Sequence, residues 1–335
     1  MVEKSIEITE EQWNLVNIEN RKMSQEYLEQ NTQLSIYTLN QYRSALRIYF
    51  WYICENCDNK PFYEIKSRDF MHFQNWLVNR GLSSSAVKLK RSVVSSFNSY
   101  VEVFYEDEYK MFKNYVNKRI PTPPPALVHE KQPLSIEEYN HLCSVLEERE
   151  LWQQVAWVRF AYSAGCRRNE TRQLLKTAVD AEEIIKDVEV KDENGNKKIV
   201  QSKSFMTSPI RCKGKGKIGK VRNLQFDQEA MDAIKKWLEI RGEDDCPYVF
   251  VSIHGDKIKQ MALETGNVWC TDIFTEIVGR RVFPHQLRSS RATNLVMELG
   301  KDILVAQKLL GHNSPETTRL YVKRKDENMS DEAFT

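Results

Sequence analysis

The chain has 335 residues, 41% of them hydrophobic, which is enough for two separate cores of ordinary size. Its 49 basic and 47 acidic side chains nearly cancel, so the net charge favours no class of partner and any preference for nucleic acid must arise locally. We find no secretory leader pattern and no run near the roughly 20 apolar residues of a membrane span, so we expect a cytoplasmic protein without a membrane partner.

The cysteines show neither a disulfide framework nor a metal site. Seven are present, an odd number, and they are scattered through a chain large enough to fold without cross-links. Cys54 and Cys57 form a lone CxxC, whereas a zinc site normally needs a second pair. We therefore expect reduced thiols and no bound metal.

The first 120 residues show the spacing of helices with one buried face. One helix is indicated by apolar residues at spacings of three and four: Leu39, Tyr42, Leu46, Tyr49, Phe50 and Ile53. A second is predicted to begin with Ser67 as its cap and to end at Gly81 in a left-handed turn. A third spans residues 84–100, with an apolar stripe of Ala86, Leu89, Val93 and Phe97. These patterns predict a small helical bundle.

A proline-rich segment separates this bundle from the second half of the chain. Four prolines fall within residues 121–125, which forbids a helix and favours an extended linker. Beyond it, Ser135 and Glu138 form a capping box at a helix start, and an apolar helix over residues 151–164 runs into Gly165. The second half therefore begins as a new helical domain.

Two hairpins are predicted next. Asn194-Gly195 lies between charged, alternating segments, which is the pattern of a β-hairpin turn. Residues 203–222 contain seven basic side chains, three glycines and no acid, and indicate a second, basic hairpin. The remaining elements are a helix from Asp227 to Ile240, a short strand over residues 248–252, and helices to residue 322 that break at Pro284, Gly300 and Gly311. We therefore expect a mainly α fold with a small antiparallel β-sheet.

Arg167 lies in a turn after Gly165, between two predicted helices. From a turn, a guanidinium can project toward a ligand while Glu170 steadies it by a charge-assisted bond. Taken alone, an ordinary surface arginine at a helix start is the commoner interpretation.

Two further patterns place polar side chains on helix faces. His285 and Arg288 are three residues apart, so they share a face on which a guanidinium can grip phosphate oxygens beside an imidazole. His312 ends one helix, and Tyr321 follows nine residues later in the next. A helix-capping histidine and a rim tyrosine are the plainer alternatives for these residues.

In this order, the patterns resemble the signature of the tyrosine recombinases, the phage-integrase and Xer-like enzymes, over residues 133–323. The matching positions are Gly165-x-Arg167-x-x-Glu170, the Lys-Gly-Lys-Gly-Lys hairpin, His285-x-x-Arg288, Leu310-Gly311-His312 and Tyr321. The resemblance implies an extension over residues 1–19, a helical, SAM-like core-binding domain over 20–118, a linker over 119–132, a catalytic domain over 133–323 and a tail over 324–335. It further implies double-stranded DNA as the substrate, a homotetramer on paired sites at the nucleoid, accessory DNA-bending proteins as further partners, and no cofactor.

The roles that the resemblance implies agree with the demands of phosphoryl transfer. Tyr321 attacks and holds the 3′ phosphate, while Arg167 and Arg288 stabilise the phosphorane. His285 is the base, and His312 donates a hydrogen bond to the phosphate.

A lysine of the basic hairpin is implied as the general acid that protonates the leaving 5′ oxygen. Lys215 is the first choice, with Lys213 and Lys217 as rivals, because sequence does not fix the register of a hairpin. Glu170 orients the site without reacting.

Other basic residues are candidate DNA contacts: Arg43, Lys88, Lys90, Arg91, Lys213, Lys217, Lys220 and Arg222. Judged alone, basic residues on helices are more often solvated surface, and the resemblance shifts this balance toward DNA.

We therefore expect a site-specific recombinase that cuts and rejoins DNA through a 3′-phosphotyrosyl intermediate and a Holliday junction, in integration or excision of a mobile element. DNA inversion or dimer resolution by the same chemistry, a type IB topoisomerase and a catalytically silent DNA-binding regulator are the alternatives. The compact spacing from His312 to Tyr321 favours the recombinase over the topoisomerase.

Overall fold

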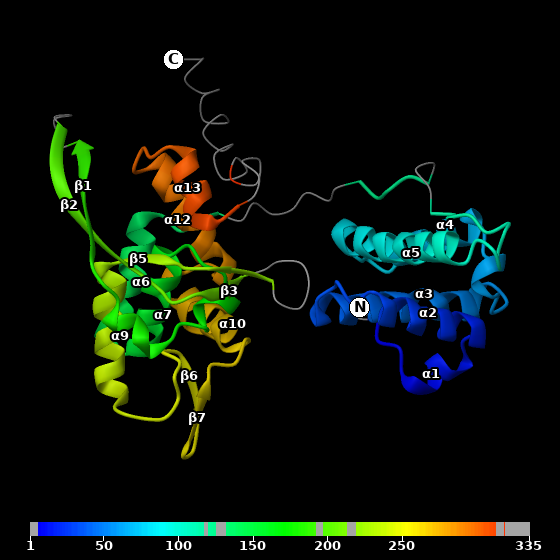
Figure 1. Cartoon of the computed structure of the whole chain (residues 1–335), viewed down its shortest axis with the longest axis horizontal. Coiled ribbons are helices and arrows are strands. Elements are labelled where there is room, and N and C mark those ends of the chain that lie inside the picture. The colour runs from blue at the N-terminus through cyan, green and yellow to red at the C-terminus, as the bar shows by residue number, and fades with distance from the viewer. Residues whose placement is uncertain are drawn as a thin grey trace. The chain divides into compact units, whose positions relative to one another are not determined.

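The computed structural model of the chain describes residues 6–116, 120–124, 132–191, 197–212 and 219–312, together with residue 318. These residues fall into two compact units, one up to residue 124 and the other from residue 132 onward. Helices dominate, and the described strands form three small antiparallel sheets, all in the second unit (Figure 1). The predicted fold class is confirmed. Within these ranges no helix combines the length and apolar character needed to cross a bilayer.

The first unit is a bundle of helices around one apolar core. Its elements are α1 (Glu10–Leu15), α2 (Ile18–Gln30), α3 (Ile36–Asn56), the 3₁₀ turn η1 (Phe62–Glu64), α4 (Ser67–Asn79) and α5 (Ser84–Phe104). The helices α2, α3 and α5 run side by side (Figure 1) and contribute aromatic rings to the core, among them Tyr27, Tyr49 and Phe97. Each buried ring removes a large apolar area from water and so stabilises the bundle. The three helices predicted here are confirmed.

Two local predictions for this unit are wrong. Leu89 is 39% exposed, whereas Val87 is 1% exposed and occupies the core. At the start of α4, the carboxylate of Asp69 accepts from the backbone N–H of Lys66 at 3.0 Å, while the hydroxyl of Ser67 donates to the carbonyl of Tyr115 at 3.0 Å. Both corrections arise from packing against distant segments, which local periodicity does not encode.

The second unit combines helices with short strands. Its helices are α6 (Ile136–Glu148), α7 (Trp152–Ser163), α8 (Arg168–Thr171), η2 (Lys176–Asp180, 3₁₀), α9 (Gln228–Arg241), α10 (Thr265–Trp269), η3 (Cys270–Phe274, π), α11 (Thr275–Val278), α12 (Pro284–Met297) and α13 (Ile303–Leu310). Its strands are β1 (Ile184–Lys191), β2 (Lys197–Met206), β3 (Ile210–Cys212), β4 (Lys220–Arg222), β5 (Gln225–Asp227), β6 (Val251–His254) and β7 (Lys257–Gln260).

The helix α7 is the centre of the second core. Eight of its residues are buried, including Trp157 and Phe160, and it packs against α6, α9 and α12. The predicted helix starts around it are confirmed: Ser135 and Glu138 form the capping box of α6, and Asp227 caps α9 by accepting from the N–H of Ala230 at 3.1 Å. A helix that is mostly buried gives a rigid support for the segments at its ends.

Both predicted hairpins are present as paired strands. β1 pairs with β2 from Ile184↔Ser204 to Lys191↔Lys197, and β2 pairs with β5. β3 pairs with β4, with Ile210 opposite Arg222 and Cys212 opposite Lys220. The turns predicted at Asn194-Gly195 and at the glycines of the basic hairpin lie outside the described residues, except Gly219.

One hairpin was missed by the sequence analysis. Residues 248–260 were expected to form a short strand followed by helix, but β6 and β7 pair from Val251↔Gln260 to His254↔Lys257. Gly255 supplies the left-handed turn between them, with φ +57°. This hairpin and the β1–β2 hairpin project from opposite ends of the unit (Figure 1). Its strands are short and half exposed, so their alternation is too brief to stand out.

Candidate active site

Arg167 lies in the turn between α7 and α8, and Glu170 lies in α8 itself. The carboxylate of Glu170 accepts from the backbone N–H of Arg167 at 3.0 Å and from its guanidinium at 2.8 Å. Burial alone would raise the pKa of Glu170, but these two bonds and the charges of Arg167 and Arg222 bring that pKa below its usual value. Glu170 is 1% exposed, while a third of the Arg167 side chain is open to solvent. An ionised, buried carboxylate therefore holds Arg167 at the surface of the site.

Arg288 lies on α12 and is fully buried. Its two terminal nitrogens donate to main-chain carbonyls, one to Gly165 and the other to Leu310 at 2.7 Å, and its Nε has no hydrogen-bond partner. Within the described ranges no carboxylate forms an ion pair with it. Burial, together with the neighbouring charge of Arg167, lowers the pKa of Arg288 to about 10, so the group stays cationic at neutral pH. This guanidinium is fixed in direction but poorly neutralised.

His312 follows the last turn of α13, which closes as a Schellman motif. The N–H of Gly311 donates to Lys308 at 3.1 Å, the N–H of His312 donates to Gln307 at 3.2 Å, and Gly311 has φ +63°. The Nδ1 of His312 lies 3.0 Å from the hydroxyl of Thr318. Burial and the charges of Arg288 and Arg167 lower the pKa of His312 to about 4. The ring is therefore neutral at pH 7.

His285 stands in the first turn of α12, one turn before Arg288. It is exposed, unlike Arg288. Its charge contributes to the lowered pKa of His312, which places the two imidazoles within electrostatic reach of each other. The structure thus brings together four residues from three separate segments of the chain: Arg167, the pair His285 and Arg288 on α12, and His312.

The described part of the basic hairpin approaches the same cluster through Arg222. Its Nη2 lies 3.3 Å from a carboxylate oxygen of Glu170, its Nη1 donates to the carbonyl of Leu309 at 3.0 Å, and its Nε donates to the sulfur of Cys212 at 3.2 Å. These internal bonds are not evident from the sequence, in which Arg222 is one of the candidate DNA contacts. No sequence signal separated it from Lys220, since both are basic and two residues apart on one strand.

The remaining candidates divide between described and undescribed residues. Tyr321, Lys213, Lys215 and Lys217 lie outside the described residues, so their places in the site are not assigned. In the first unit Arg43 and Lys88 are exposed, and Lys90 and Arg91 are half buried. Burial lowers the pKa of both Lys90 and Arg91.

Arg91 also packs within its own bundle. Its guanidinium lies 5.7 Å from the ring centre of Phe70 and donates to the side chain of Gln74 at 3.0 Å.

The described residues contain no group of three or more His, Cys, Asp or Glu arranged to hold a metal ion. All seven cysteines are free thiols. Chemically, the cluster offers two guanidiniums, two imidazoles and a carboxylate that orients one of the guanidiniums, an arrangement suited to binding an anionic oxygen and moving a proton beside it.

Two family models match the chain. The model described as "Phage integrase family" matches residues 132–328, and "Phage integrase, N-terminal SAM-like domain" matches residues 25–102. The chain belongs to the phage integrase family. It is therefore a tyrosine-type site-specific recombinase, an enzyme of DNA recombination and integration, and the expectation drawn from its motifs is confirmed.

Individual relatives agree with this assignment. The recombinase is 33% identical to the SPbeta prophage-derived recombinase-like protein YomM of Bacillus subtilis (strain 168), over 94% of this chain and 90% of the relative. It is 28% identical to the tyrosine recombinase XerA of Thermococcus onnurineus (strain NA1), over 84% of each chain.

Solved structures share the fold of this integrase-family chain. The XerH site-specific recombinase bound to palindromic difH substrate, in a post-cleavage complex, matches with a TM-score of 0.61 and 19% identity, over 88% of this chain and 78% of that one. The Tn1549 transposon integrase in complex with transposon right end DNA matches with a TM-score of 0.65 and 13% identity, over 90% and 94%. These similarities extend over both units.

Proposed function

We propose that this recombinase binds double-stranded DNA, cleaves one strand by attack of Tyr321 on a phosphodiester, and rejoins it to a new partner. The observation that carries the proposal is the burial of Arg288, a fully buried guanidinium that forms no ion pair within the described ranges and whose positive charge is only partly offset by nearby Glu170. Keeping an ion away from water costs several kcal/mol even after the protein relaxes. The negative charge of a DNA phosphate offsets that cost, so the site favours an anion.

The second arginine completes the phosphate site. Arg167 is partly exposed and is held by Glu170, so it meets the phosphate from a position that needs no reorganisation. Preorganised positive groups stabilise the crowded, more negative phosphorane better than the ground state, which is the condition for catalysis. Neutral His312 supports it by donating a hydrogen bond to a non-bridging oxygen.

The reaction balances within the chain and its DNA. The phenolic oxygen of Tyr321 bonds to phosphorus as the bond from phosphorus to the 5′ oxygen breaks. Exposed His285 takes the phenolic proton, and a hairpin lysine protonates the leaving oxygen, with Lys215 as first choice and Lys213 and Lys217 as rivals. The phosphotyrosyl bond retains the energy of the broken diester, so a 5′ hydroxyl reverses the step without ATP.

The parts of the chain have different roles in this proposal. We assign residues 20–118 to DNA binding, 119–132 to the linker, 133–323 to catalysis and 324–335 to a tail. The two matched ranges, 25–102 and 132–328, support a division into two domains. Arg43, Lys88, Lys90, Arg91 and Lys220, with Lys213 and Lys217 of the hairpin, are the proposed DNA contacts.

A homotetramer on paired DNA sites would exchange two strand pairs through a Holliday junction. The prophage origin in the name of the Bacillus relative supports integration or excision of a mobile element, and the DNA complexes named among the solved structures support duplex binding. Accessory DNA-bending proteins are further proposed partners.

Covalent trapping tests this proposal. DNA that co-purifies with the protein is sequenced to find its site, and a nicked suicide duplex of that site is incubated with wild type and with Tyr321→Phe. We expect a band on denaturing gels that contains protein and DNA for wild type and no such band for the variant. Duplex binding without a covalent band in wild type would instead identify a silent DNA-binding regulator.

A further inference from the structure

Arg222 joins three elements at the edge of the site. Its side chain extends from β4, and its guanidinium contacts the carboxylate of Glu170 in α8. The same guanidinium donates to the carbonyl of Leu309 in the last turn of α13 and to the thiol of Cys212 on the paired strand β3. About a quarter of its side chain is exposed. Each of the three guanidinium nitrogens therefore has a partner inside the protein, which is the pattern of a residue that holds neighbouring segments together.

Its partners are the supports of the catalytic cluster. Glu170 holds Arg167, and the turn that follows Leu309 presents His312. The adjacent carbonyl, that of Leu310, is taken by Arg288. Two arginines from different elements thus cover consecutive carbonyls at the negative end of α13, where cations are favoured.

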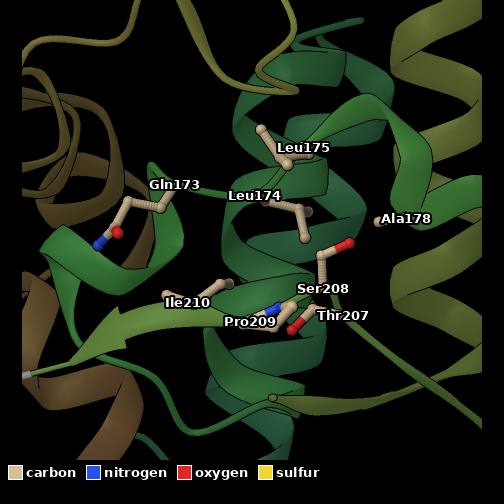
Figure 2. Close-up of a pocket in the computed structure, with 8 residues that line it drawn as sticks. All are labelled: Gln173, Leu174, Leu175, Ala178, Thr207, Ser208, Pro209 and Ile210. Atoms are coloured by element: carbon tan, nitrogen blue, oxygen red, sulfur yellow. The ribbon is translucent and has the colours of Figure 1, made fainter. Parts of the chain in front are cut away.

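The other strand of the hairpin is fastened to the same region. The side chain of Gln173, just after α8, accepts from the N–H of Arg211 at 3.2 Å and donates to its carbonyl at 3.0 Å. Figure 2 shows this junction, where Gln173 and Leu174 lie on one side of a small pocket and Pro209 and Ile210 lead into β3 on the other. The base of the basic hairpin is therefore anchored on both strands. The Arg222 anchor contacts the carboxylate of Glu170 itself, which holds Arg167.

We infer that Arg222 is a positioning residue that sets the basic hairpin in register with the arginine and histidine cluster. The inference rests on the proposed function, in which a lysine of this hairpin is the general acid. A misplacement of about 1 Å in a catalytic group can cost about 100-fold in rate, so the anchor at the base of the hairpin governs proton delivery to the leaving oxygen.

Two substrates separate this role from a DNA contact and from simple stability. In one suicide duplex the leaving atom is the normal 5′ oxygen. In the other it is a bridging sulfur, and because a thiolate leaves without help from an acid, the second duplex bypasses the lysine. Rates of covalent complex formation are measured at saturating protein for wild type, Arg222→Met, Arg222→Lys and the matched control Lys220→Gln. Affinity is measured at several salt concentrations.

We expect Arg222→Met to slow cleavage of the oxygen substrate by roughly 10- to 100-fold and that of the sulfur substrate by less than about 3-fold, with affinity unchanged. Arg222→Lys keeps the positive charge but loses the planar guanidinium with its several donors. Its cleavage rate should therefore lie between those of Arg222→Met and wild type. Arg222→Lys also keeps a cation beside buried Glu170, so it provides the test of the inference if Arg222→Met does not fold. Lys220→Gln should instead weaken binding and lower the salt slope by about 1.

Three results would overturn the inference. Equal slowing on both substrates would make Arg222 a general structural residue. Weaker binding with a normal rate in the bound complex, as for the control, would make it a DNA contact. A wild-type rate would show that the anchor has no role. If wild type itself forms no covalent complex on either substrate, the proposed function fails, which is a separate outcome.

Discussion

Replacing Gly311 by alanine tests the close approach between the end of α13 and Arg222. Gly311 has φ +63°, and a Cβ built on it would lie 2.5 Å from Nη1 of Arg222. An alanine in the left-handed region costs about 1–2 kcal/mol. The tip of Arg222 must also move away, which removes its charge-assisted bond to Leu309 and adds about 1.5–3 kcal/mol. We expect a total loss of about 2.5–5 kcal/mol in the unfolding free energy of the second unit.

Gly300→Ala is the matched control for this loss. Gly300 has a similar φ of +58° and lies in the same unit, but nothing is within 4 Å of its built Cβ, so only the backbone cost of about 1–2 kcal/mol applies. Urea unfolding followed by tryptophan fluorescence compares the two variants at constant slope. In an Arg222→Met background, Gly311→Ala should cost no more than Gly300→Ala. Equal losses for the two glycine variants in the wild-type background would refute the crowding argument.

Three further predictions concern the charges of the site. Inorganic phosphate at ten times its Kd, added at constant ionic strength, should stabilise wild type by about 1.4 kcal/mol in thermal unfolding. Arg288→Met should lose this gain and Arg43→Met should keep it, whereas an equal gain in both variants would argue against an anion site at Arg288. The pKa of His312, lowered to about 4, predicts a ring that stays neutral as pH falls from 6.5 to near 4, while the unfolded chain takes up its proton. The stability present above pH 6.5 should therefore decline over that range, and an NMR titration of the ring with a midpoint near 6.5 would contradict this. The lowered pKa of Glu170 predicts stability that is present above pH 4.5 and lost below it, so Glu170→Gln should show a shallower loss than wild type between pH 5 and 3 in urea unfolding.

Sequence reasoning succeeded where the determining interactions are local. The helix with Leu46 and Ile53 on its buried face, the capping box at Ser135 and the cap at Asp227 all depend on residues within a few positions of one another. The helix start at Pro284, which places His285 and Arg288 in one helix, was also predicted from local residues. The coming together of Arg167, Arg288 and His312 required the resemblance to a family, because no local rule brings three separate segments to one place.

The failures lie where tertiary contacts decide between equal local choices. Leu89 and Val87 are both apolar and two positions apart, and only the neighbouring helices determine which of them is buried. Arg222 and Lys220 cannot be distinguished in the sequence, since both are basic residues of one strand. In the structure, Arg222 contacts Glu170, more than 50 residues away, and Leu309, more than 80 residues away. The burial of Arg288 was likewise invisible, since arginine is ordinarily a surface residue.

The partners of Arg288 have a consequence for mutational tolerance. Both of its bonds end on main-chain oxygens, at Gly165 and Leu310, so no side-chain replacement at those positions deletes an acceptor directly. The orientation of this arginine depends instead on the path of the backbone at the ends of α7 and α13. Random mutagenesis around the cluster should therefore spare many substitutions that keep this path, and should penalise insertions and deletions in either segment severely.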